Sequence, residues 1–95
     1  MNKPRICLSI IENNQEAIRK IETEVDWFEI RLDILKDDWL KVAAGFSKPW
    51  IACNRSREEG GQGELNPDLR MEALLAAGKA GASIIDIEFA TAGLA

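Results

Sequence analysis

Residues 26–35 (DWFEIRLDIL) alternate apolar and charged side chains with a period of two, the pattern of a β-strand. The two faces of this strand carry Phe28, Ile30, Leu32 and Ile34 on one side and Glu29, Arg31 and Asp33 on the other. A parallel strand covered by helices normally has two apolar faces. The charged face therefore indicates either an edge strand with one side in solvent or a strand lining a polar pocket inside a barrel. We favour the pocket.

Three further strand-like segments flank this stretch. They are an almost continuous apolar run at 5–11 (RICLSII), a proline-led run at 49–55 (PWIACNR) and an alternating run at 83–89 (SIIDIEF). Charged residues recur at the end of the run at 49–55, as Arg55, and along the run at 83–89, as Asp86 and Glu88. We expect these charges to meet the charged face of 26–35 where the strands end.

Segments with helical spacing separate the strands. The first follows an Asn13 or Asn14 cap, has Glu16 at a capping-box position and extends to Val25. A short second helix follows Asp37 or Asp38 and closes near Gly45. The third begins with Asn66 and Pro67 and ends at Gly81, after a polar loop with three glycines at 56–66 (SREEGGQGELN).

The alternation of strand and helix predicts an α/β fold with a parallel sheet, formed by residues 1–95 as a single domain. Two architectures fit four such strands. One is the N-terminal half of a (β/α)8 barrel, whose complete form takes roughly 250 residues. The other is a small open doubly wound sheet.

Composition narrows the function classes. With 16 acidic and 12 basic residues, the chain has no broad positive field for nucleic acid. No apolar run approaches the length of a membrane span, and the first residues do not resemble a signal peptide, so we expect a cytoplasmic protein. The absence of histidine excludes His-based triads and metal sites. Cys7 and Cys53 have no metal or redox spacing and are expected to be free, buried thiols.

Three segments together resemble the N-terminal half of type I 3-dehydroquinate dehydratase, the Schiff-base lyase of the shikimate pathway. They are FEIRLDIL at 28–35, CNRSREEGG at 53–61 and SIIDIEF at 83–89. The resemblance runs from Ile6 to Phe89. It implies that Ser9, Glu29, Arg31 and Arg55 bind 3-dehydroquinate, and that Glu59, before Gly60 and Gly61, orients a catalytic histidine.

The family chemistry needs a lysine that forms an imine with the substrate ketone and a histidine that removes the adjacent proton. No histidine is present, and the family's lysine belongs to a later strand. The resemblance therefore implies a truncated barrel that uses no metal or organic cofactor and is inactive alone. Its partners would be the substrate and either the remainder of the barrel or a second copy in a dimer. The alternative is a standalone, non-catalytic half-barrel that acts as a binding or assembly module.

Overall fold

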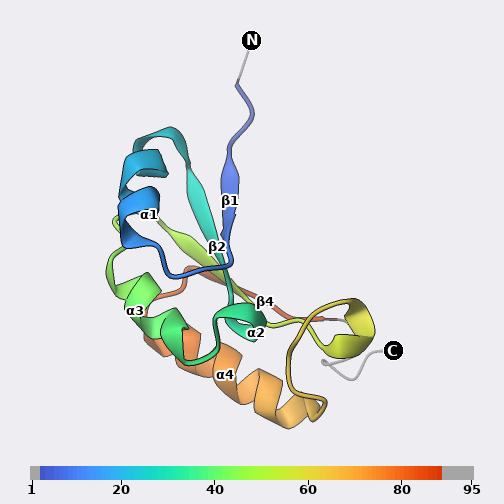
Figure 1. Cartoon of the computed structure of the whole chain (residues 1–95). Helices are drawn as coiled ribbons and strands as arrows, with labels where there is room; N and C mark the ends of the chain where they lie inside the picture. Colours follow the sequence, from blue (N-terminus) through green and yellow to red (C-terminus); the bar gives the residue numbers. More distant parts are fainter. Residues whose placement is uncertain (1–2, 89–95) are drawn as a thin grey trace.

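The computed structural model describes residues 3–88, which form a four-stranded sheet with helices between the strands (Figure 1). The strands are β1 (Cys7–Ile10), β2 (Trp27–Arg31), β3 (Trp50–Cys53) and β4 (Ile84–Asp86). The α-helices are α1 (Gln15–Ile21), α2 (Leu32–Leu35), α3 (Trp39–Ala44) and α4 (Pro67–Lys79). Short 3₁₀ turns occupy η1 (Glu22–Glu24), η2 (Lys36–Asp38) and η3 (Arg57–Glu59).

All strand pairs are parallel, and the strand order is β1-β2-β3-β4. A doubly wound sheet reverses its strand order at a switch point, whereas a barrel adds each strand beside the previous one. The sequential order therefore confirms the predicted α/β class and is consistent with the N-terminal half of a (β/α)8 barrel. Strands β1 and β4 form the two edges of the sheet.

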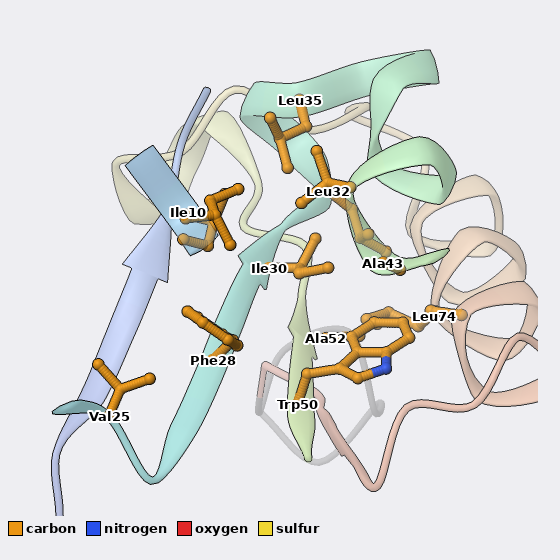
Figure 2. Packing of buried hydrophobic residues seen from close by; sticks show 13 residues of the cluster. Ile10, Val25, Phe28, Ile30, Leu32, Leu35, Ala43, Trp50, Ala52 and Leu74 are labelled. Atoms are coloured by element: carbon orange, nitrogen blue, oxygen red, sulfur yellow. The ribbon is translucent and has the colours of Figure 1, made fainter. Parts of the chain in front are cut away.

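The core lies between the sheet and the helices. Phe28, Ile30 and Ala52 are fully buried on the strands, and Val42 and Leu74 are buried on α3 and α4. Figure 2 shows Ile30 of β2 and Ala52 of β3 near the centre of this cluster, with Leu74 approaching from α4. The stacked rings of Phe28 and Phe46 lie 4.3 Å apart between centroids. One face of the sheet is thus sealed by helices.

Two asparagines begin the longer helices, as their sequence positions predict. The Asn14 side chain accepts a hydrogen bond from the amide of Ala17 at 3.1 Å, and Asn66 accepts one from Asp68 at 2.8 Å. Pro67 occupies the first turn of α4. Glu16 instead forms a helix-surface ion pair with Lys20 at 3.3 Å, and not the expected capping box.

The boundaries of five elements differ from the sequence prediction. The strand at 26–35 ends at Arg31, and Leu32–Leu35 forms a helical turn in which the Asp33 side chain accepts hydrogen bonds from Arg31 and from the Gln62 amide. The strands expected at 5–11, 49–55 and 83–89 are shorter, and Phe89 lies outside the described residues. The helix expected to reach Val25 changes to a 3₁₀ turn at η1.

Candidate functional site

The sheet face opposite the helices carries the polar residues of the strands. Register pairs Ser9 of β1 with Glu29 of β2, and Arg31 of β2 with Cys53 of β3. Cys53 is in turn paired with Asp86 of β4. Residues paired in this way point to the same side of a parallel sheet. The hydroxyl, carboxylate and guanidinium groups therefore share one face, towards the carboxyl ends of the strands.

Ser9 and Glu29 form the first contact on this face. The Ser9 hydroxyl donates a hydrogen bond to Glu29 Oε1 at 2.5 Å. The Glu29 carboxylate also helps to raise the pKa of two neighbouring thiols, Cys7 and Cys53, although burial is the larger cause for both. Glu29 therefore adds to the effect of burial at both thiols on this face.

Arg31 and Asp33 form a bidentate ion pair at the end of β2. Arg31 Nε donates to Asp33 Oδ1 at 3.0 Å, and Nη2 donates to Oδ2 at 2.7 Å. The hydrogen bond to Asp33 is the largest cause of the raised pKa of Arg31. Burial alone would raise the pKa of Asp33, but the bonds from Arg31 and from the Gln62 amide outweigh it and hold that pKa below its usual value.

Arg31 and Asp33 thus have different surroundings, which corrects the expectation that both charges line one open face. The Asp33 side chain is fully buried, whereas Arg31 retains 17% exposure and can present donors to a ligand. The expectation failed at Asp33 because α2 replaces the last part of the predicted strand.

Arg55 lies two residues beyond β3, with its side chain exposed, and not within the strand as predicted. The glycine loop, residues 56–65, folds back against it. The Gly63 amide donates to the Arg55 carbonyl at 2.7 Å, and the Gly61 amide donates to the Ser56 carbonyl at 2.8 Å. A Cβ at Gly63 would lie 2.5 Å from the Arg55 carbonyl oxygen, so only glycine permits this approach.

The glycine loop is anchored by two charged residues from other elements. Glu88, after β4, accepts a hydrogen bond from the Ser56 amide at 2.9 Å. Arg70, in the first turns of α4, donates to the carbonyls of Glu64 and Leu65 and lies 3.8 Å from Glu88 Oε1. These contacts hold the backbone on both sides of the glycines.

This role of Arg70 was not predicted, although the sequence contains a signal for it. Position 70 lies on the same helix face as the buried residues Leu74 and Ala77, where an apolar side chain would be expected. A buried arginine on an apolar helix face requires partners, and here the loop carbonyls and Glu88 are among them.

A further polar residue lies on the edge strand β4. Asp86, on β4, accepts a hydrogen bond from the Cys53 thiol at 3.3 Å. The side chain of Glu59 lies outside the described part of the structure, so its expected role remains a prediction. Among the residues that the structure describes, no cluster of three acidic or thiol side chains could hold a metal ion, and no helix is long and apolar enough to span a membrane.

The hydrogen-bonding groups on this face suit a small polar ligand. A guanidinium and a carboxylate on one strand, with a serine hydroxyl beside them, can donate to and accept from hydroxyl and carboxylate groups. The described residues supply hydrogen-bonding groups here, but the sequence contains no histidine to act as a general base near neutral pH.

Sequentially ordered parallel strands, with helices on one face and polar groups at the strand ends of the other, define a protein of the (β/α)-barrel class. Comparison with known proteins narrows this class. The chain belongs to the type I 3-dehydroquinase family, whose model matches residues 6–94.

Two curated relatives from Dehalococcoides mccartyi, strains BAV1 and CBDB1, bear the name 3-dehydroquinate dehydratase. Each is 35% identical to this chain over 94 residues, which is 99% of the chain and 42% of the relative. A relative from strain 195 with the same name is 35% identical over 92 residues. The chain therefore spans less than half the length of these relatives.

Proposed function

We propose that this chain supplies the substrate-binding βα units of a cytoplasmic 3-dehydroquinate dehydratase, which converts 3-dehydroquinate to 3-dehydroshikimate. The observation that carries the proposal is the row of Ser9, Glu29 and Arg31 on adjacent parallel strands of a chain from the type I 3-dehydroquinase family. Free thiols at Cys7 and Cys53 fit a reducing compartment.

The proposed binding roles follow from the chemistry of the ligand. Arg31 and Arg55 donate to the carboxylate and hydroxyl oxygens of 3-dehydroquinate, and Glu29 accepts from its hydroxyl groups. Ser9 holds Glu29 in place through its hydroxyl. Glu59, on the glycine loop, is proposed to orient the base.

The catalytic groups come from outside this chain in the proposal. An imine between a lysine and the ketone makes the adjacent carbon acidic, after which a histidine removes the proton and water leaves. With no histidine in the sequence, the 95-residue chain alone is proposed to be inactive. The remaining part of the barrel supplies the lysine and the histidine.

The test uses a reconstituted assembly, defined as this chain mixed with the part of a D. mccartyi relative that lies outside the matched 42%. Borohydride is added with 3-dehydroquinate, and each piece is weighed by intact mass spectrometry. The proposal predicts a reduced substrate adduct on the added piece and none on this chain. An adduct on a lysine of this chain, or on neither piece, would contradict it.

A second candidate function, a half-barrel assembly module, is favoured by the two open edges of the sheet. Parallel edge strands present unpaired backbone groups. Large apolar residues near them are half exposed, with Ile6 at 50% beside β1 and Ile84 at 47% in β4. Two copies could pair β4 of one with β1 of the other. Sedimentation of the purified chain as a dimer would support this function, and a monomer would contradict it.

A further inference from the structure

Asp33 is a buried carboxylate that none of the proposed binding roles uses. Its side chain accepts three hydrogen bonds from two separate parts of the fold. Two come from the Arg31 guanidinium, and the third comes from the Gln62 amide at 3.0 Å. These two donors lie 31 residues apart in the sequence, and Asp33 joins them.

The first connection fixes the direction of Arg31. Both bonds use the edge of the guanidinium that carries Nε and Nη2, which leaves the Nη1 donors outside this ion pair. A bidentate contact holds the planar group in one orientation, whereas a single bond would allow it to rotate. Asp33 therefore presents Arg31 to the uncovered sheet face in a defined pose.

The second connection fixes the glycine loop against Arg55. Gln62 lies between Gly61 and Gly63, the two glycines that pack against the Arg55 backbone. The Gln62 amide is held by Asp33, and its carbonyl accepts from Lys36 Nζ at 2.7 Å. A displacement of Gln62 would therefore move the loop away from Arg55.

We propose that Asp33 is a positioning residue that couples the pose of Arg31 to that of the glycine loop and Arg55. Both arginines then adopt their ligand-binding positions together. The coupling itself rests on the contacts of Asp33, and its effect on 3-dehydroquinate rests on the proposed function.

The coupling is tested in the full chain by NMR, with Asp33→Asn as the variant. We expect the Gln62 amide to exchange with solvent about tenfold faster or more, which corresponds to losing a hydrogen bond to a charged group. The Ile30 amide, in the central sheet, should change by a smaller factor. The Arg31 Nε–H signal should shift and lose its protection. Asp37→Asn, an exposed neighbour with the same charge change, should alter neither signal.

A second variant keeps the test decisive if Asp33→Asn fails to fold. Arg31→Gln leaves Asp33 in place but removes its bidentate partner, and we expect the Gln62 amide to lose protection there too. A Gln62 amide whose exchange is unchanged in either folded variant overturns the coupling.

Kinetics of the reconstituted assembly separate this inference from the proposed function. Asp33→Asn should raise KM for 3-dehydroquinate about tenfold to a hundredfold, with a smaller change in kcat, because Arg31 and Arg55 bind the ligand. An equal loss in kcat with KM unchanged would contradict the positioning role. If the unsubstituted assembly shows no turnover, the proposed function fails, while the NMR results still decide the coupling.

Discussion

Ser9 on β1 donates a hydrogen bond to Glu29 on the neighbouring strand β2, and the two residues are register partners in the sheet. The contact crosses from one βα unit to the next, on the face that the helices leave open. The bond fixes the Glu29 carboxylate in one orientation on this face. The register of β1 and β2 thus brings a hydroxyl and a carboxylate from two βα units into contact.

Glu29→Gln should raise KM of the reconstituted assembly about tenfold or more, since a charged acceptor for the ligand hydroxyls is lost. Ser9→Ala should have a smaller effect in the same direction, because it only releases Glu29. Steady-state kinetics measures both changes. Glu24→Gln, an exposed charge on η1, is the matched control and should leave KM unchanged.

Acid should destabilise the chain partly through Asp33. Because its folded pKa lies below the unfolded value of about 3.9, its contribution is complete above that value and is lost as the pH falls through the folded pKa. Urea unfolding of the chain and of Asp33→Asn should therefore give a stability difference that is largest near neutral pH and shrinks below about pH 4. A difference that stays constant between pH 7 and pH 3 would be incompatible with the ion pair.

The two thiols should differ in reactivity. Cys7 is exposed, whereas Cys53 is buried, with a pKa raised chiefly by burial and further by Glu29 and Asp86. Iodoacetamide applied to the folded chain should add one label, on Cys7, and a second label only in denaturant. Mass spectrometry of Cys7→Ser provides the control, which should remain unlabelled until it is unfolded. Rapid labelling of Cys53 in the folded chain would show that β3 is not packed as described.

Glu88 should control the mobility of the glycine loop. Glu88→Gln weakens the acceptor for the Ser56 amide and removes the charge beside Arg70, so the Ser56 amide should exchange several-fold faster. Hydrogen exchange read by NMR gives the rate. Glu72→Gln, on the exposed side of α4, should leave it unchanged. Equal exchange rates of the Ser56 amide in the two variants would show that Glu88 does not anchor the loop.

Local signals in the sequence predict much of this fold. Asn66 and Pro67 place the start of α4 correctly, because capping depends on neighbouring residues alone. The alternation of strand and helix along the chain predicts the parallel sheet, because a helix between two strands allows them to run in the same direction. The side-chain pairing of Glu29 with Ser9 was not predicted, but it follows once the two strands lie in register.

Long-range contacts account for the failures. The apolar spacing at Leu32 and Ile34 continues the strand pattern. The hydrogen bond between Asp33 and Gln62, however, joins residues 29 positions apart, so a local sequence pattern does not predict it. Cys7 was expected to be buried, and this is wrong, because β1 is an edge strand and Cys7 lies on the uncovered face. The burial of Arg70 likewise depends on loop carbonyls whose position the sequence does not reveal.

The dehydration rate of 3-dehydroquinate tests the central claim most directly, measured for this chain alone, for the complementary piece of the D. mccartyi relative alone, and for their mixture. We expect turnover in the mixture only, and a marked loss of turnover at low substrate concentration when the mixture contains Glu29→Gln. Turnover by the isolated 95-residue chain, or a mixture whose rate does not depend on Glu29, would contradict it.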